Sequence, residues 1–338
     1  MNRFAYARPA TIADAAALLA RPGTRAIAGG TNIVDLMKEG VESPDLLVDL
    51  RRLPLSEIRE GEGGALSLGA LVTNADTAYD PRVAERFPLL ASAILAGASA
   101  QLRNAATNGG NLNQRTRCYY FYDVATPCNK REPGSGCGAL GGVNRIHAIL
   151  GASDQCIATH PSDMCVALAA LAARVKLHGP DGERIVEFAD YHRLPGDDPS
   201  RDTNLAPGEI VTAIDIDPFD CGPHWTYLKL RDRLSYAFAL VSVAVALRIE
   251  AGEVREARIA LGGVAHKPWR RPEAEALLVG RAAEDEAAFE AAAARLVKGA
   301  VGQGGNDFKI EMVRRAIVRA LGQAAAGTPQ PIADKRIA

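Results

Sequence analysis

Hydrophobic and polar positions alternate over the first fifty residues in a pattern that predicts a small α/β unit. Apolar residues at helical spacing indicate two helices, and short apolar runs indicate two strands. In chain order we expect a helix, a strand, a helix and a strand over residues 11–20, 25–28, 33–40 and 45–50. Thr11 with Asp14 resembles a capping box, and Gly40 is typical of a helix end.

The rest of the chain predicts antiparallel strands mixed with helices. A strand that runs into a helix is expected over 65–77, followed by an alanine-rich helical stretch over 88–106. Ser162 can cap the next helix. We expect this helix over 162–173 and two strands joined by a Pro-Asp-Gly turn over 175–188. A polar loop over 195–208 leads to a strand over 209–216 and a linker over 220–224. Three strands over 225–264 and two amphipathic helices over 273–325 follow. The pattern predicts an α+β protein with a separate C-terminal domain.

Composition narrows the function classes. At 338 residues, with 48% hydrophobic and 23% charged residues, the chain is long enough for two or three buried cores. Its 39 Lys and Arg nearly balance its 40 Asp and Glu, so we expect no nucleic-acid partner and no general attraction to an anionic membrane. The N-terminal segment lacks the long apolar core of a signal peptide, and no long apolar run occurs, so we expect neither an export signal nor a membrane span.

A strand, a glycine pair and a helix follow one another in RAIAGGTNIVDLMK, residues 25–38. Paired glycines let backbone N–H groups approach a phosphate, and a helix N-terminus adds partial positive charge. The alternative is a tight strand-to-helix turn capped by Thr31 or Asn32, because the segment has neither the G-x-G-x-x-G fingerprint nor a Walker A loop.

A second glycine pair occurs in LRNAATNGGNLNQR, residues 102–115. A helix C-cap would explain one of its glycines, but it would leave the rest of TNGGN unexplained. Two such turns can hold one long diphosphate ligand from both sides. We therefore predict a second half of the same site here.

The cysteines cluster in one part of the chain. All six lie between Cys118 and Cys221, and five lie between Cys118 and Cys165, separated in turn by nine, eight, eighteen and eight residues. The absence of a C-x2-C pair disfavours a zinc ribbon or finger. An iron-sulfur cubane can take thiolates from a longer irregular loop, and PGSGCGALGG supplies suitable small residues. Buried free thiols, or one or two disulfides, are the alternatives, and core packing is the expected role of Cys165.

Four cations border this cysteine loop: Arg115, Arg117, Lys130 and Arg131. A four-iron cluster with four thiolates is anionic, so nearby cations would stabilise its reduced form. The alternative is a solvated basic loop.

With AGGTN, TNGGNL, the cysteine loop and HPSDM in this order, the chain resembles the FAD-binding medium subunit of molybdenum hydroxylases, the xanthine dehydrogenase and carbon monoxide dehydrogenase family. The resemblance covers essentially the whole chain. Within this family, the chain is most similar to the subunit of bacterial aromatic aldehyde oxidoreductases that binds a [4Fe-4S] cluster in addition to the flavin. The segments that carry this similarity are QRTRC, PCNKREPGSGC, CIATHPSDM, RDRLSYAFALVSVA and LGGVAHKPWR.

The resemblance implies an α+β fold with a two-part FAD-binding domain of the PCMH type, which is vanillyl-alcohol oxidase-like. Its parts would be residues 1–54 and residues 55–220, with the iron-sulfur loop at 114–160. An α+β C-terminal CO dehydrogenase flavoprotein domain would follow at 224–330.

The resemblance also implies site residues. The FAD pyrophosphate would lie on Arg25, Ala26, Ile27, Ala28, Gly29, Gly30, Thr31, Asn32 and Ile33, and the second clamp would be Thr107, Gly110 and Asn111. Asp163 would bind the ribityl and flavin region, with Val211 and Lys229 near the ring; alone, these three are typical of a helix first turn, a core strand and a surface lysine. The cluster ligands would be Cys118, Cys128, Cys137 and Cys156, with Cys165 as a rival to Cys156. Asn108 departs from the apolar residue or Thr of many relatives.

The function implied is electron transfer. Electrons would leave an aldehyde at a molybdenum cofactor in a large partner subunit, pass through [2Fe-2S] clusters in a small one, reach FAD here and leave to an external acceptor. We expect no catalytic side chain in this chain and no aldehyde oxidation by it alone. We expect assembly in the cytoplasm, with folded export beside a signal-bearing partner. Two other classes stay open: a self-contained FAD-dependent oxidoreductase, and a non-redox module with a structural zinc.

Overall fold

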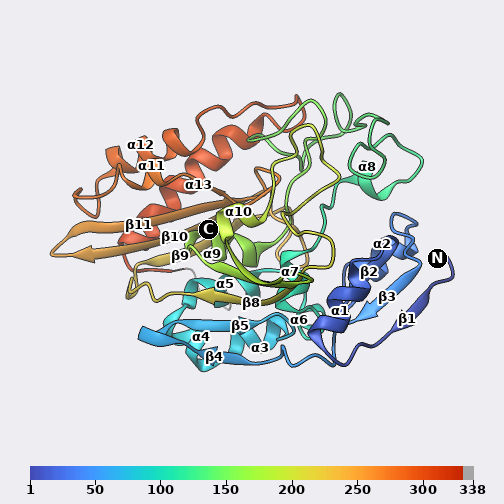
Figure 1. Ribbon diagram of the computed structural model, residues 1–338. Helices are drawn as coiled ribbons and strands as arrows, with labels where there is room; N and C mark the ends of the chain where they lie inside the picture. Colours follow the sequence, from blue (N-terminus) through green and yellow to red (C-terminus); the bar gives the residue numbers. More distant parts are fainter. Residues whose placement is uncertain (330–338) are drawn as a thin grey trace.

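The chain builds three β-sheets within residues 1–329, which the computed structural model describes (Figure 1). Residue 330, the last of the predicted C-terminal domain, lies outside the described residues. Helices and strands are mixed throughout, so the predicted α+β fold is confirmed. Among the described helices, none is long and apolar enough to cross a membrane.

The first sheet belongs to the small N-terminal unit. Its three strands are parallel in the order β1-β3-β2, as expected for strands joined by helices. The elements are β1 Ala5–Ala7, α1 Ile12–Leu19, β2 Thr24–Ile27, α2 Ile33–Lys38 and β3 Leu46–Asp49. The Thr11 side chain accepts a hydrogen bond from the Asp14 N–H, which confirms the predicted start of α1.

The second sheet is antiparallel, in the order β4-β5-β8-β6-β7. Its strands are β4 Ile58–Glu60, β5 Leu66–Gly69, β6 Arg174–Gly179, β7 Gly182–Glu187 and β8 Ile210–Ile216, with a 3-10 turn at Glu62–Gly64. The helices between and after these strands are α3 Asn74–Tyr79, α4 Pro81–Arg86, α5 Pro88–Ala96, α6 Ala100–Arg103, α7 Asn108–Leu112, α8 Tyr119–Tyr122, α9 Asp163–Ala170 and α10 Phe188–Tyr191.

The predicted helical stretch over 88–106 is interrupted. Gly97 is extended, and Ala98 has a φ of 51°, in the left-handed region. The helix hydrogen bonds cannot continue through these two residues, so α5 ends at Ala96 and Ser99 caps α6. This bend leaves Gly97 and Ala98 on the wall of the cleft described below.

The third sheet forms the C-terminal part, in the order β12-β11-β10-β9. Its elements are β9 Trp225–Leu230, β10 Val241–Glu250, β11 Glu253–Gly262, β12 Trp269–Arg270, α11 Pro272–Glu275, α12 Glu286–Leu296 and α13 Phe308–Ala325. Buried side chains recur along α13 at helical spacing, and this apolar stripe packs on β9 and β10. Helix α9, whose eight residues are all buried, packs on β10 and β11. Helix α9 therefore joins the central core to the C-terminal sheet.

Residues 114–160 are mostly irregular, with α8 as their one helix among the described residues (Figure 1). Their own small core contains cysteines together with Phe121 and Ile157, and Leu36 of α2 packs into it. The cysteine loop therefore lies against the N-terminal unit.

Candidate cofactor sites

The first glycine turn is held against the second by backbone contact. A Cβ added at Gly29 would lie 1.8 Å from the Ala105 carbonyl oxygen, so any larger residue would force the two turns apart. Gly30 has a φ of +74°, which favours glycine. The glycine pair thus joins two segments that are far apart in sequence.

The second turn is the beginning of a helix. Thr107 caps α7, its hydroxyl accepting from the Gly110 N–H at 3.2 Å. The C-cap alternative is therefore wrong, because both glycines of TNGGN lie in the first turn of α7. Asn108 is fully buried and bonds Thr77 and the Gly69 carbonyl, so its amide holds the turn to neighbouring elements.

A cleft of about 760 Å³ runs between these turns and the C-terminal sheet. Six of the residues predicted for FAD line it: Thr31, Asn32, Gly110, Asn111, Asp163 and Lys229. The others lie outside its lining: Arg25, Ala26, Ile27, Ala28, Gly29, Gly30, Ile33, Thr107 and Val211. Val211 is buried in β8 within the core, and Arg25 pairs with Glu42. The roles predicted for these residues stay predictions.

The cleft wall carries buried polar atoms that lack partners among residues 1–329. These atoms are Asn32 Nδ2, Arg103 Nε, Arg117 Nε and His160 Nε2. Three of the four are amide or guanidinium donors, and buried donors of this kind are normally satisfied. A ligand rich in acceptor oxygens, such as a dinucleotide, fits this wall.

Asn111 is the centre of a hydrogen-bond network on the floor of the cleft. Its Nδ2 donates to Asn74 Oδ1 at 2.7 Å, and its Oδ1 accepts from Ser162 Oγ at 2.5 Å and from Gln114 Nε2 at 2.7 Å. Ser162 also caps α9. This network links α3, α7 and the start of α9. Sequence patterns did not point to Asn74 or Gln114 as members of it.

A buried ion pair lines the cleft. Lys229 Nζ lies 2.8 Å from Asp163 Oδ2, and Tyr227 donates to Asp163 Oδ1 at 2.6 Å. Burial, aided by the Asp163 charge, raises the pKa of Tyr227 well above its usual range, which keeps the phenol protonated. The surface-lysine alternative for Lys229 is wrong, since its side chain is 1% exposed. Sequence reasoning missed Tyr227, which lies two residues before Lys229 and on the same side of β9.

Four cysteines surround a second, small cavity: Cys118, Cys128, Cys137 and Cys156. Cys128 and Cys137 face each other as an isolated antiparallel pair, and the Asn129 side chain accepts from the Gly134 and Gly136 N–H groups. These glycines have φ values of 87° and 101°, so the loop needs glycine to fold back at this point. All six cysteines lie in the described residues, and none forms a disulfide, so the disulfide alternative is wrong.

Two thiols of this cavity, Cys118 and Cys156, are poorly suited to remain charged alone. Burial raises the pKa of the Cys118 thiol to about 12 and that of Cys156 to about 11. The Ala158 N–H donates to Cys156 Sγ at 3.4 Å, and His147 Nε2 lies 3.1 Å from Cys118 Sγ. Four convergent sulfurs, with a backbone N–H aimed at one and an imidazole nitrogen beside another, fit a thiolate-ligated metal group, which would supply the positive charge that burial demands.

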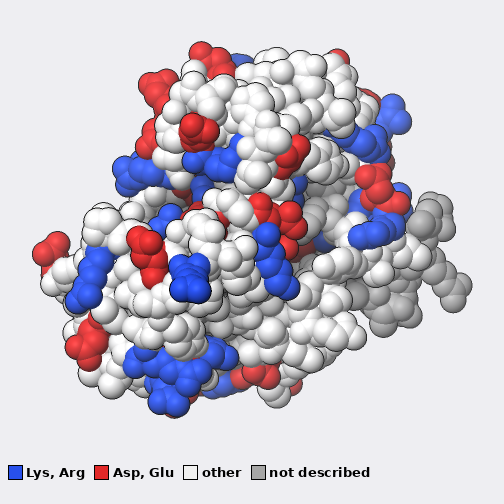
Figure 2. Space-filling model, turned by 90° about the vertical axis from the view of Figure 1, so that its right-hand side faces the viewer, with Lys and Arg blue, Asp and Glu red and all other residues white. Residues whose placement is uncertain are grey.

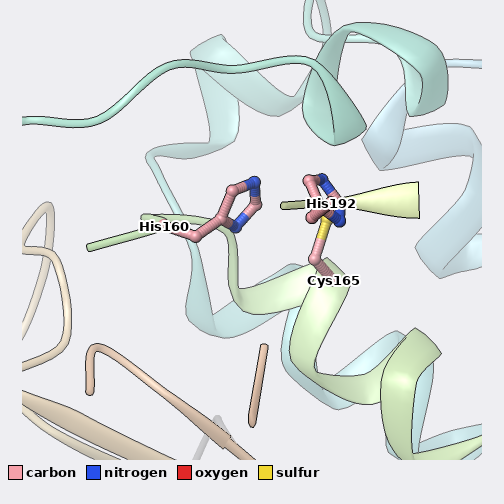
Figure 3. A group of neighbouring side chains, drawn as sticks. All are labelled: His160, Cys165 and His192. Atoms are coloured by element: carbon pink, nitrogen blue, oxygen red, sulfur yellow. The ribbon is translucent and has the colours of Figure 1, made fainter. Parts of the chain in front are cut away.

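Cys165 lies in a different place. It is fully buried on α9 in the central core, facing His160 and His192 (Figure 3). Their ligand atoms all lie within 4.8 Å of one another, while His192 Nε2 is already bonded to the Leu112 carbonyl. Cys165 is therefore not a rival to Cys156 in this structure, and its predicted packing role agrees with its position.

The four loop cations are engaged rather than solvated. Arg115 pairs with Glu42 and Asp202, each at 2.8 Å, and the buried Lys130 pairs with Asp202 at 2.5 Å. Burial opposes ionisation of Asp202, but Lys130 and Arg115 hold its pKa below its usual range. Arg117 pairs with Asp35, and Arg131 donates to three carbonyls of the loop. The solvated-loop alternative is wrong, and carboxylates neutralise most of the charge predicted to act on a cluster.

On the surface as a whole, charge is mixed. Figure 2 shows Lys and Arg interspersed with Asp and Glu on the face that it presents. This agrees with the near balance of charges along the sequence.

Two family matches cover almost the whole chain. Residues 2–218 match the FAD binding domain in molybdopterin dehydrogenase, and residues 225–324 match the CO dehydrogenase flavoprotein C-terminal domain. The aldehyde oxidoreductase FAD-binding subunit PaoB of Escherichia coli strain K12 is 47% identical over 328 residues, 96% of this chain and 99% of that protein. The carbon monoxide dehydrogenase medium chain of Hydrogenophaga pseudoflava is 31% identical over 331 residues, 96% of this chain and 98% of that one.

Solved structures agree with these matches. Carbon monoxide dehydrogenase from Hydrogenophaga pseudoflava superimposes with a TM-score of 0.75 at 29% identity, covering 96% of this chain and 98% of that chain. Quinoline 2-oxidoreductase from Pseudomonas putida 86 superimposes with a TM-score of 0.73 at 27% identity, covering 97% of this chain and 98% of that chain. The chain therefore belongs to the family of FAD-binding medium subunits of molybdenum hydroxylases.

Proposed function

We propose that this chain is the FAD- and [4Fe-4S]-binding electron-transfer subunit of a molybdenum-dependent aldehyde oxidoreductase. It receives electrons from [2Fe-2S] clusters of a small partner subunit, which take them from a large molybdenum-cofactor subunit, and FAD passes them to an external acceptor. The 47% identity with the aldehyde oxidoreductase subunit PaoB, over nearly the full length of both chains, supports the aldehyde as substrate.

The unpartnered donors on the wall of the 760 Å³ cleft support this cleft as the place where FAD binds. The pyrophosphate would lie between Thr31 and Asn32 on one side and Gly110 and Asn111 on the other, where two helices begin. The Asp163 and Lys229 pair, which lines the same cleft, would lie at the flavin end. These residues bind and orient the cofactor, which carries out the hydride and electron chemistry itself.

The convergence of four cysteines on one cavity is the observation that carries the cluster assignment. An iron-sulfur cluster needs four thiolates in a shell of backbone donors, and this loop offers both. When bound, the cluster would exchange single electrons. The chain's part is to ligate iron through Cys118, Cys128, Cys137 and Cys156, and to exclude water from it.

Serine substitutions test this assignment. Cys128→Ser and Cys137→Ser are expected to lose the iron and the acid-labile sulfide of the cluster and to keep part of the FAD. Cys165→Ser and Cys221→Ser are the matched controls, because both cysteines lie outside the cavity, and they should keep the iron. Iron, sulfide and flavin are measured in complex purified without oxygen.

Each alternative class has its own outcome. Zinc in place of iron in the wild-type chain would establish the structural-zinc module. Aldehyde oxidation by the isolated chain with an artificial acceptor would establish a self-contained oxidoreductase. Iron content unchanged in both loop variants would remove the cysteine loop as the cluster site.

We also propose that the subunit is assembled in the cytoplasm and exported folded, beside a partner that carries the signal. Folded export would carry the subunit to the periplasm with its cofactors already inserted. Cell fractionation with and without the partner's signal segment tests this. Retention in the cytoplasm in both cases would contradict it.

A further inference from the structure

His147 is the one histidine among residues 1–329 that contacts a cysteine of the four-cysteine cavity. Its Nε2 lies 3.1 Å from Cys118 Sγ, and both residues are buried. The ring lies 6.4 Å, centroid to centroid, from Tyr119 in an edge-type arrangement and 6.4 Å from Tyr120, whose ring is tilted against it. Its Nδ1 has no hydrogen-bond partner among the described residues, so the contact with Cys118 is the polar contact of this ring.

The backbone of His147 is fixed by the C-terminal part of the chain. Its carbonyl accepts from Lys309 Nζ at 2.8 Å and from Asn306 Nδ2 at 3.1 Å. Lys309 Nζ also donates to the Gly263 carbonyl at 2.5 Å, and both Asn306 and Lys309 are fully buried. The imidazole is thus held in place by protein groups before any metal group binds.

Ligation to iron decides the direction of the hydrogen bond. A cysteine that ligates iron has lost its proton and can only accept, so the Nε2 of His147 must be the donor. A hydrogen bond to a cluster thiolate is stronger when the cluster carries more negative charge, which is the reduced state. Such a bond raises the reduction potential.

We propose that His147 is a positioning residue that raises the reduction potential of the cluster through an N–H···S hydrogen bond to Cys118. This rests on the proposed function, in which Cys118 ligates iron. Hydrogen bonds to charged groups are stronger than those between neutral groups. The potential depends on how much more strongly this bond stabilises the reduced cluster than the oxidised one. We expect a three- to tenfold change in the oxidised-to-reduced ratio, or up to about 59 mV for one electron.

Three variants of the assembled complex test the proposal by redox titration followed with EPR. His147→Leu removes the donor and should make the potential more negative by the amount above. His147→Gln places an amide N–H at similar reach and should restore most of the wild-type potential. His178→Leu, on β6 and outside both sites, is the control and should match the wild type.

The outcomes separate the two levels of the proposal. If wild-type complex contains no four-iron signal, the cluster assignment fails, whatever His147 does. If the signal is present and the Leu variant has the wild-type potential, the His147 inference is overturned. If the Leu variant takes up no iron, His147→Asn, whose shorter amide cannot reach Cys118, replaces it in the comparison with Gln. Equal potentials in the Asn and Gln variants would then overturn the inference.

Discussion

Gly29 is the residue that lets the two glycine turns beside the cleft come together. Its missing side chain lets the Ala105 carbonyl approach, so this glycine serves contact between chain segments. Gly110 is different, because its Cβ position lies at the cleft, with only Thr107 Oγ1 within 4 Å, at 3.0 Å. The glycines look alike in the sequence, and only the fold separates these roles.

We expect Gly110→Val to lower the FAD content of the purified complex severalfold. The new methyl groups would occupy the cleft beside Asn111, while the helical backbone at this position accepts a side chain. Flavin absorbance per chain measures the effect. Gly322→Val is the matched control, since Gly322 is also helical, has no atom near its Cβ position and lies outside the cleft. Equal FAD content in both variants would show that the phosphate does not lie at Gly110.

At the residue scale, the sequence allowed four cysteines to be proposed as ligands, but it did not indicate which residues contact them. Cysteines are rare and clustered, so four ligands could be proposed from their spacing and flanking residues. His147 and Tyr227 are common residue types at unremarkable positions, and their contacts depend on segments 29 and 64 residues away.

At the scale of elements, the buried pair Asp163 and Lys229 joins α9 to β9, and Lys229 also donates to the Ala96 carbonyl at the end of α5. Three elements thus share one charge pair. The sequence predicts α9 and β9 well from their apolar runs, but periodicity says nothing about which charged residue is buried between them. The bend at Gly97 and Ala98 was missed for a similar reason, because alanine is the strongest helix former and tertiary packing overrides it there.

We expect Lys229→Met to lower the free energy of unfolding by about 3–5 kcal/mol, because it leaves the Asp163 carboxylate buried without its cation. Urea unfolding of FAD-free protein measures this apart from any loss of cofactor binding. Lys176→Met is the control, since the Lys176 pair with Asp215 is partly exposed and should contribute less than about 1 kcal/mol. The double variant Asp163→Asn, Lys229→Met should recover much of the loss; no recovery would mean that the pair is not coupled.

At the scale of the molecule, three histidines lie in the interior where the loops meet the central core: His192 and His266 are buried, and His160 is half-buried. Burial lowers the pKa of His192 and of His266 to about 4, and that of His160 well below its usual range. These rings are neutral in the folded chain at pH 7. Unfolding exposes them to water, where each titrates near about 6.5.

Stability is therefore expected to fall as the pH decreases from about 6.5 to 4. In that window the unfolded chain binds protons that the folded chain does not, so protonation favours unfolding. Each histidine contributes a slope of up to about 1.4 kcal/mol per pH unit. Urea unfolding at several pH values should show a shallower slope for His192→Phe than for the wild type, and parallel slopes would contradict the neutral assignment of His192.

The order of parts along the chain was predictable, and their assembly was not. The α+β class and the change of character near residue 220 follow from local patterns and turn residues. The meeting of α9, the cysteine loop and the C-terminal sheet depends on pairs such as His147 with Lys309, which are 162 residues apart. The local hydrophobic pattern does not indicate which residues so far apart in the sequence come into contact.

The hydrogen bonds from Asn306 and Lys309 to the His147 carbonyl have a consequence for biosynthesis. Both residues leave the ribosome long after the cysteines, and until then the carbonyls of His147 and Ala148 have no bond from them. On the proposed cluster assignment, the four cysteines of a nascent chain would lie in a loop that these contacts do not yet fix. We then expect insertion of the proposed cluster to wait until translation has finished, so that a chain cut before residue 300 would carry all six cysteines and still hold no cluster.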